Sequence, residues 1–590
     1  MKIQNKFRVI GAIALLVAGS CFRVPAQQSA NVDEKAEVKT GKITGRVVTD
    51  SGQPMTNATI YVRPFSNSAP GPGRTTNTDA EGNFQVDGLE PALYTIFVSA
   101  PAYVSGPRGG EPGQPTLYRL GESPKFVMYK GGVLTGTVTN TAGEPVVAIG
   151  VRALLVREAD GQPANSAGAQ FWDRNTDDRG IFRIYGMQAG TYVVSAGGFS
   201  GNFPFNLNAY DVNVPTYSPS STRDTATEFT VRAGEETSGV DIRYRAEPGH
   251  IISGSVIRTN NEVPVNINIT LTSVLNDKPQ WSTSSFQLPS LKGFAFNGIS
   301  DGDYDISATT SVGGEFTTSE VRRITVKGAN VTGIELKTMP LATVSGRLNL
   351  ESSKTPECKD KRRPQISEML VRTEREGKVN ASNYSLLRYL GAQAVPAADG
   401  SFLFKTLLSG QYTFSIKYFA KYWFVDSITL ATHTAAGVKI APEPVDVSRT
   451  WVRVKSGDRL TGLIVNLSEG AASLRGQLAV PKGQASAENF LLYLTPAERE
   501  RANNAFHVYV TTANADGSFT FSNLAPGRYW PIVRARNEVD ALTHTKIYWP
   551  DQVDTRARLR REAEAAKKEI ELKPCENKTG FDLTFPPANP

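Results

Sequence analysis

Hydrophobic and polar positions alternate along most of the chain in short runs that turns separate. Residues 78–100, TDAEGNFQVDGLEPALYTIFVSA, show the pattern well: a turn precedes an alternating run at Phe84 and Val86. Leu89, a break and a second apolar run beginning at Tyr94 follow. Because alternation places every second side chain on one face of a strand, this stretch predicts a strand, a tight corner and a second strand.

The same sequence pattern occurs five times with the same spacing between its residues. Each copy has an apolar residue five positions before a tyrosine and a phenylalanine ten positions before it. A glycine stands two positions before the tyrosine in four copies, and Ala92 is the departure. The tyrosines are Tyr94, Tyr192, Tyr304, Tyr412 and Tyr529. Such agreement within one chain indicates tandem modules.

The tyrosines are interpreted as structural. A tyrosine just past a corner, with its ring buried and its hydroxyl bonded back to the turn, is typical of the tyrosine corner of Greek-key sandwiches. Each unit also opens on a short strand around a glycine: Gly45, Gly136, Gly254, Gly346 and Gly476. The pattern predicts an all-β chain, a tandem array of about five immunoglobulin-like Greek-key β-sandwiches.

The repeat starts predict the domain boundaries. We expect sandwiches at 41–130, 131–248, 249–340, 341–469 and 470–590, after a leader at 1–26 and a linker at 27–40. One segment reads as a helix, about 554–572, because Leu559, Ala563, Ala566 and Ile570 fall on one face at helical spacing. A helix docked on the last module and a partner-binding helix are both open.

The composition indicates globular modules, and the N-terminal segment indicates an extracytoplasmic location. The 590 residues are 40% hydrophobic and 21% charged, with a net charge of +7. Basic residues are interspersed with acidic ones rather than forming a stripe with aromatics, which argues against nucleic acid as a partner. The N-terminal segment has basic residues, an apolar core and small residues before Ala26, which is the layout of a secretory signal peptide. Lipoprotein cleavage before Cys21 is the alternative.

Two cysteines remain if Cys21 leaves with the leader. Cys358 and Cys575 lie far apart in sequence, and an oxidising compartment permits a disulfide between them. That bridge requires the last two modules to fold back on each other. Two unpaired thiols are the alternative.

The repeated residues resemble those of a known family. The first unit carries Gly45, Val47, Gly52, Pro54, Thr78, Asp79, Gly82, Phe84, Leu89 and Tyr94, and the second carries Gly136, Val138, Gly143, Pro145, Thr176, Asp177, Gly180, Phe182 and Tyr192. This pattern is similar to the carboxypeptidase regulatory-like domain. The resemblance implies a seven-stranded transthyretin-like sandwich, also grouped with carbohydrate-binding-like folds. The third and fourth units match more loosely.

No catalytic, metal or cofactor site is expected. A zinc peptidase needs histidine and glutamate ligands, commonly His-x-x-Glu, and none of the four histidines has a glutamate three residues on. Residues 298–302 match G-x-S-x-G, but the register places Ser300 in a strand–corner–strand context without the required helix. We therefore expect a non-enzyme.

Binding is expected in loops that the repeats do not share, at 63–77, 104–117 and 197–226, although plain solvated loops are the alternative. The six tryptophans are candidate sugar-stacking platforms. We expect a secreted or periplasmic binding or scaffold protein whose partner is a polysaccharide or a surface protein. A carbohydrate-binding array and an accessory subunit of a cell-surface complex are the alternatives, and association with the outer membrane is compatible with each.

Overall fold

A computed structural model describes the chain from residue 40 to residue 584. Within that span it leaves out 66–72, 107–115, 165–170, 199–208, 259–266, 288–292, 313–314, 360–362, 378–392, 432–443, 481–485 and 537–545. The expected leader, the linker and Cys21 lie outside the described residues.

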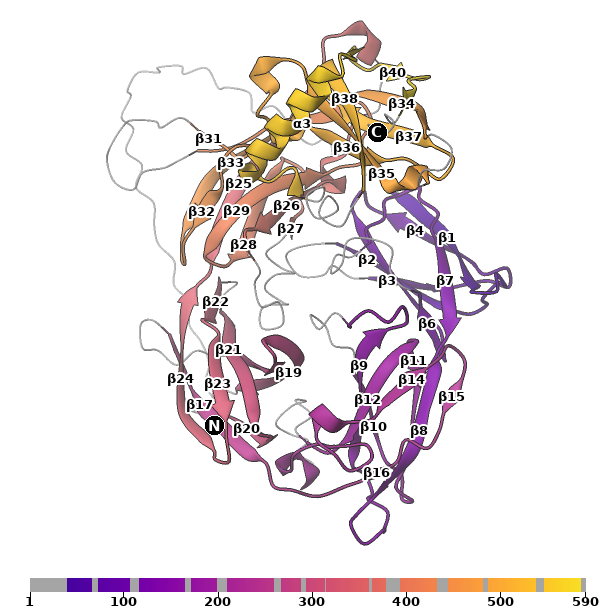
Figure 1. The fold of residues 1–590 in the computed structure, drawn as a ribbon, viewed down its shortest axis with the longest axis vertical. Coiled ribbons are helices and arrows are strands. Elements are labelled where there is room, and N and C mark those ends of the chain that lie inside the picture. The colour runs from indigo at the N-terminus through magenta and orange to yellow at the C-terminus, as the bar shows by residue number, and fades with distance from the viewer. Residues whose placement is uncertain are drawn as a thin grey trace, which may run out of the picture. The chain divides into compact units, whose positions relative to one another are not determined.

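The fold is all-β, a tandem array of five Greek-key β-sandwiches with one α-helix among the described residues, in the last sandwich (Figure 1). The division of the chain at residues 130, 248, 340 and 469 remains our proposal, and the strands are grouped by it below.

The first sandwich has sheets of order β4-β1-β7-β6 and β3-β2-β5. Ile43, Ile60 and Phe84 belong to one buried cluster that both sheets supply. The strands are β1 (Gly41–Thr49), β2 (Thr59–Pro64), β3 (Arg74–Asn77), β4 (Asn83–Leu89), β5 (Tyr94–Ser99), β6 (Tyr103–Ser105) and β7 (Lys125–Lys130).

The second sandwich has sheets of order β10-β9-β12-β13 and β11-β8-β15, with β14 paired to β12 and β16 to β8. Its strands are β8 (Gly132–Thr139), β9 (Gly150–Glu158), β10 (Phe171–Asn175), β11 (Ile181–Met187), β12 (Gly190–Ala196), β13 (Thr216–Tyr217), β14 (Glu228–Val231), β15 (Glu236–Thr237) and β16 (Ile242–Arg243). Two 3-10 turns, η2 (Ala209–Val212) and η3 (Arg223–Thr225), flank β13.

In the third sandwich one continuous path, β19-β18-β21-β22-β24-β17-β20, joins the two layers, because β22 pairs with both β21 and β24. The strands are β17 (His250–Arg258), β18 (Ile267–Leu275), β19 (Lys278–Gln287), β20 (Phe294–Ile299), β21 (Gly302–Val312), β22 (Glu315–Ser319), β23 (Arg322–Val326) and β24 (Val331–Pro340).

The fourth sandwich has sheets of order β28-β25-β33-β30-β31 and β27-β26-β29-β32. Its strands are β25 (Ala342–Glu351), β26 (Leu370–Arg375), β27 (Gln393–Ala394), β28 (Ser401–Leu407), β29 (Gly410–Lys417), β30 (Trp423–Leu430), β31 (Val445–Asp446), β32 (Val452–Val454) and β33 (Arg459–Glu469). The 3-10 turns η4 (Pro356–Cys358) and η5 (Ile366–Glu368) lie between β25 and β26.

The fifth sandwich has sheets of order β37-β34-β40, with β41 also on β34, and β36-β35-β38-β39. The strands are β34 (Ala472–Ala479), β35 (Phe490–Pro496), β36 (Tyr509–Thr512), β37 (Ser518–Leu524), β38 (Gly527–Ala535), β39 (Ile570–Leu572), β40 (Asn577–Lys578) and β41 (Leu583–Thr584). Its 3-10 turns are η6 (Ala487–Asn489), η7 (Arg499–Arg501), η8 (Ala505–His507) and η9 (Pro550–Gln552).

The helix of the last sandwich is shorter than the sequence predicts. Helix α3 (Val553–Ala565) packs on β35 and β38, with Leu559 and Ala563 buried (Figure 1). The predicted end at residue 572 is wrong, because the chain reverses at Lys567, whose φ is 51°. Ile570 then pairs with Tyr529 in a sheet instead of extending the helical face.

Every sandwich uses the same strand pairing around its first strand. The opening strand pairs antiparallel with the strand that carries the repeated phenylalanine, and parallel with the closing strand. The opening glycine lies opposite that phenylalanine in all five: Gly45–Phe84, Gly136–Phe182, Gly254–Phe294, Gly346–Phe402 and Gly476–Phe519. The sequence repeat therefore corresponds to one repeated strand arrangement.

Candidate functional site

The five repeated tyrosines have one geometry. Each hydroxyl donates to the main-chain carbonyl oxygen four residues earlier, while each ring is at least 96% buried. The bonds are Tyr94 to Glu90 (2.7 Å), Tyr192 to Gln188 (2.9 Å), Tyr304 to Ser300 (2.9 Å), Tyr412 to Leu408 (2.8 Å) and Tyr529 to Ala525 (2.8 Å). Burial raises the pKa of Tyr304 and of Tyr412 to about 12, so both hydroxyls stay protonated donors.

Each corner places its glycine beside an edge strand. Four glycines pair with an apolar residue of the strand that follows in the sheet: Gly190 with Val231, Gly302 with Val326, Gly410 with Val454 and Gly527 with Leu572. On the edge strand, the residues that flank each of these pairs are exposed. The corner thus creates the same surface position in four sandwiches.

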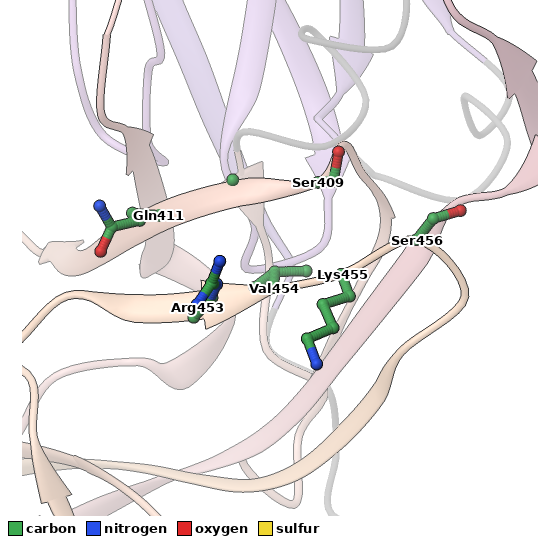
Figure 2. Close-up of a pocket in the computed structure, with 7 residues that line it drawn as sticks. Ser409, Gln411, Arg453, Val454, Lys455 and Ser456 are labelled. Carbon is green, nitrogen blue, oxygen red and sulfur yellow. The ribbon is translucent and has the colours of Figure 1, made fainter.

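In the fourth sandwich this position is hollowed. A pocket of about 500 Å³ is lined by the start of β29 and by the end of β32 with the two residues that follow it. Figure 2 shows its two sides, one strand carrying Ser409 and Gln411 and its neighbour carrying Arg453, Val454 and Lys455. Gly410 and Ser456 complete the lining. Nearly all of these side chains are polar, so the pocket suits a hydrophilic ligand.

The pocket is electropositive. Arg453 and Lys455 are exposed, and the described lining contains no aspartate or glutamate. A third cation lies beside it, because Arg375 donates through Nε and Nη2 to the carbonyl oxygen of Ser409, at 3.1 and 2.7 Å. Gly410 permits that approach, since a Cβ there would lie 2.3 Å from Arg375 Nε.

The nearby acidic groups are already engaged. Glu376 accepts a hydrogen bond of 2.5 Å from the Gln411 amide. Asp458 accepts one of 2.8 Å from the main-chain nitrogen of Lys455. Both carboxylates keep their negative charges, but neither forms an ion pair with Arg453 or Lys455, whose side chains are exposed.

The two cysteines are joined in the structure. Cys358 of η4 and Cys575, which follows β39, form a disulfide with a Cα–Cα distance of 5.4 Å. Hydrogen bonds link the same two sandwiches: Asn523 donates to the carbonyl oxygens of Ala420 and Trp423, at 2.7 and 2.8 Å. The bridge thus joins two sandwiches that also contact each other.

The residues with catalytic resemblance have structural partners. Ser300 of the G-x-S-x-G match is hydrogen bonded through Oγ to the Tyr304 hydroxyl at 3.0 Å. His250 Nε2 lies 3.1 Å from Asp301, and His507 is 97% buried between Phe424 and its own sandwich. His433 and His544 lie outside the described residues. Within the described ranges, no group of three or more His, Cys, Asp or Glu side chains could hold a metal ion.

The described tryptophans contact protein rather than forming open platforms. Trp423 is buried in the fourth core, and Trp451 packs edge-on against Trp549 at 5.3 Å. Trp549 also donates to Glu374 at 2.7 Å, and Trp530 lies under Arg560. The side chains of Trp172 and Trp281 lie outside the described residues.

The pocket that sequence reasoning missed lies at the rim beside the corner. The expected loops do not line the pocket; one of them, 63–77, contains strand β3, and large parts of the others are not described. A signal was available in the edge strands. Aligned on the corner, the edge strands of the second to fifth sandwiches read TVR (230–232), TVK (325–327), RVK (453–455) and ELK (571–573). Only the segment of the fourth sandwich, RVK, begins with a cation.

Fold and geometry define a β-sandwich repeat protein. The family model of the carboxypeptidase regulatory-like domain matches residues 42–116. The first sandwich therefore contains a carboxypeptidase regulatory-like domain, and the other four share its corner and strand pairing. A comparison with curated proteins finds no match.

Several solved structures are similar to parts of the chain. The minor pilin GBS52 of Streptococcus agalactiae has 12% identity over 35% of this chain and 96% of its own, with a TM-score of 0.19. The major pilin subunit BcpA of Bacillus cereus has 11% identity over 51% and 99%, with a TM-score of 0.14. The shaft pilin SpaA of Lactobacillus rhamnosus GG has 11% identity over 35% and 98%, with a TM-score of 0.16. No functional argument follows from scores of this size.

No helix within the described ranges is both long enough and apolar enough to span a membrane.

Proposed function

We propose that this chain is an extracytoplasmic, non-catalytic binding or scaffold protein. The observation that carries the proposal is the separation between shared and unshared residues. The five sandwiches share the glycine–phenylalanine pairing and the tyrosine corner, which are structural. They differ at the exposed rim beside the corner, where the fourth has a polar, cationic pocket. A constant frame with a variable rim suits binding.

The chemistry of the pocket supports a non-catalytic role. Hydrolysis by a serine needs a base within hydrogen-bond reach of the hydroxyl. The described lining holds Ser409 and Ser456 but no histidine or carboxylate. Ser456 instead donates its hydroxyl to the carbonyl oxygen of Pro340 at 2.7 Å.

The disulfide supports an extracytoplasmic location. Stable disulfides form in oxidising compartments, and both Cys358 and Cys575 are at least 93% buried. A secretory leader at residues 1–26, or a lipid anchor at Cys21, would place the chain there. The mass of the mature N-terminus distinguishes the two.

Two measurements test the proposed function. Cells producing the full chain are fractionated, and the purified chain, labelled with a fluorophore, is titrated onto isolated cell envelopes. We expect recovery outside the cytoplasm and saturable binding. The same preparation is assayed with peptide and ester substrates, with and without zinc. Turnover above that of a heat-unfolded sample would overturn the non-catalytic assignment, and a cytoplasmic chain would overturn the location.

A carbohydrate-binding array is the second candidate, and one observation favours it. Tyr61 of β2 and Phe97 of β5 lie directly opposite each other and are 38% and 42% exposed. Thr75 of β3 lies on the other side of Tyr61. Exposed aromatic faces beside hydroxyl groups are suited to sugar stacking. Replacement of Tyr61 by alanine would weaken glycan binding at this sheet, and binding that does not respond would count against it.

A further inference from the structure

The repeats supply an internal comparison of the rim. The residue after each corner glycine faces one residue of the edge strand: Thr191 faces Thr230, Asp303 faces Thr325, Gln411 faces Arg453 and Arg528 faces Glu571. The next outward position of the edge strand is basic in all four, as Arg232, Lys327, Lys455 or Lys573. The distinguishing residue of the fourth sandwich is therefore Arg453.

In the third and fifth sandwiches the equivalent polar groups are satisfied locally. Thr325 donates its hydroxyl to Asp303 at 2.6 Å, so this rim carries a carboxylate. Arg528 is paired with Glu569 at 3.3 Å. Neither rim leaves a guanidinium without an acidic neighbour.

The fourth rim differs in charge. Neither Arg453 nor Lys455 forms an ion pair with a described residue, and Arg375 brings a third cation to the carbonyl oxygen of Ser409. A planar guanidinium binds a carboxylate or phosphate through two parallel hydrogen bonds, and an ammonium adds a point charge. This set of donors can therefore hold one anionic group.

The other residues that line the pocket indicate which class of molecule bears the anionic group. Ser409 and Ser456 present hydroxyl oxygens, Gln411 presents an amide, and Val454 is the one apolar side chain of the described lining and is buried. Arginine clusters also bind acidic peptide motifs, whereas other peptide segments are held by apolar pockets or by strand addition. A ligand covered with hydroxyl groups matches this lining better, because its O–H groups can donate to Ser456 Oγ and Gln411 Oε1, whose own side chains already donate to Pro340 and Glu376.

From this geometry we propose that the pocket beside Gly410 binds an acidic saccharide, a sugar unit bearing a carboxylate or a phosphate. Arg453 and Lys455 hold the anionic group, and Ser409, Gln411 and Ser456 contact hydroxyl groups of the sugar. This inference rests on the proposed binding function and names the ligand class of one site within it.

The test uses the full chain and defined probes in titration calorimetry. The probes are a hexamer of galacturonic acid, a phosphorylated hexose, a neutral glucose hexamer, hexaglutamate and inorganic phosphate. Arg453→Thr imports the residue of the second and third sandwiches and so should fold normally. Lys327→Ala, the position of the third sandwich that corresponds to Lys455, is the matched control. Arg453→Lys keeps the positive charge but removes the two parallel N–H donors of the guanidinium.

We expect at least one acidic sugar to bind, with affinity falling as salt rises. Arg453→Thr should weaken that binding by about 10-fold or more, Arg453→Lys by less, and Lys327→Ala by under about 2-fold. Comparison of the uronate with the phosphorylated sugar identifies the anionic group.

Three results would overturn the inference: neither acidic sugar binding, binding unaffected by Arg453→Thr, or hexaglutamate or phosphate alone binding as tightly as the sugars. A matching melting temperature for each variant guards against misfolding. Retention of the chain on cell envelopes is scored separately, so a negative result here leaves the wider binding function standing.

Discussion

Phe402 lies directly across the sheet from Gly346, and a Cβ at Gly346 would lie 2.5 Å from Phe402 Cζ. The phenylalanine ring covers the glycine and fills the space that a side chain would need. The first and last sandwiches repeat this contact, with corresponding distances of 2.4 Å at Gly45 and 2.8 Å at Gly476. The repeated glycine and phenylalanine are thus two halves of one packing unit.

Replacement of Gly346 by alanine should therefore destabilise the fourth sandwich. The added methyl group must displace the Phe402 ring and the Leu463 carbonyl oxygen, which would lie 2.2 Å away. We expect a loss of roughly 2 kcal/mol or more, measured as faster hydrogen exchange in β25 and β28. Ser345→Ala, on the same strand, is the control and should cost under about 0.5 kcal/mol. Equal exchange in the two variants would contradict the packing argument.

The tyrosine corner can be tested through its hydroxyl alone. Tyr192→Phe keeps the buried ring but leaves the Gln188 carbonyl oxygen without this 2.9 Å hydrogen bond. The expected cost is about 1 kcal/mol, while Tyr192→Ala, which also removes the ring, should cost roughly 3 kcal/mol or more. Tyr185→Phe is the control because Tyr185 is 47% exposed. Thermal unfolding of the three variants gives the comparison, and a shift below about 0.5 kcal/mol for Tyr192→Ala would rule out the corner role.

The sequence predicted the core residues that packing holds at a fixed spacing along the chain. Phe402 and Tyr412 lie on consecutive strands, β28 and β29, which belong to the two different sheets of the fourth sandwich. Both side chains enter the same core, so the number of residues between them cannot vary without moving one of them out of it. The end of helix α3 was mispredicted for a related reason. Ile570 fits helical spacing as well as strand alternation, and the reversal at Lys567 that decides between them depends on tertiary pairing with β38.

The pocket could not be predicted from one segment. Gln411 and Arg453 are far apart in sequence and become neighbours only because β29 pairs with β32. The short edge strand also lacks enough residues for a periodic signal. Only the alignment of the four edge strands on their corners isolates Arg453, and that alignment requires the sheet order.

The disulfide should couple the last two sandwiches. Cys358 and Cys575 are separated by 217 residues, and a cross-link over a loop of that length restricts the unfolded chain by an entropic equivalent of about 5.4 kcal/mol. A double Cys358→Ser, Cys575→Ser variant should lose part of this and unfold its last two sandwiches at lower denaturant concentration. Peptide mapping without reduction should recover the two cysteines in one linked fragment. Recovery of both as free thiols from freshly isolated chain would contradict the bridge.

His507 predicts how stability depends on pH. The side chain is 97% buried, packs 6.3 Å from the Phe424 ring across the junction of the last two sandwiches, and its ring nitrogens lack side-chain partners. Burial, reinforced by the nearby charge of Arg501 and partly offset by Glu498, lowers its pKa to about 4. The folded chain therefore binds fewer protons than the unfolded chain between pH 4 and the ordinary histidine pKa near 6.5.

The contribution of neutral His507 to the free energy of unfolding should be fully present above about pH 6.5. It should fall progressively as the pH drops toward 4, by roughly 3 kcal/mol in total. Below pH 4 both states carry the proton, so no further loss arises from His507. His507→Leu should flatten the dependence over this window, read as hydrogen exchange in β35 and β36 at stepped pH. His250→Gln, at a partly exposed histidine paired with Asp301, is the control and should leave the slope in these strands unchanged. An unaltered slope in His507→Leu would assign the acid sensitivity of the junction to other groups.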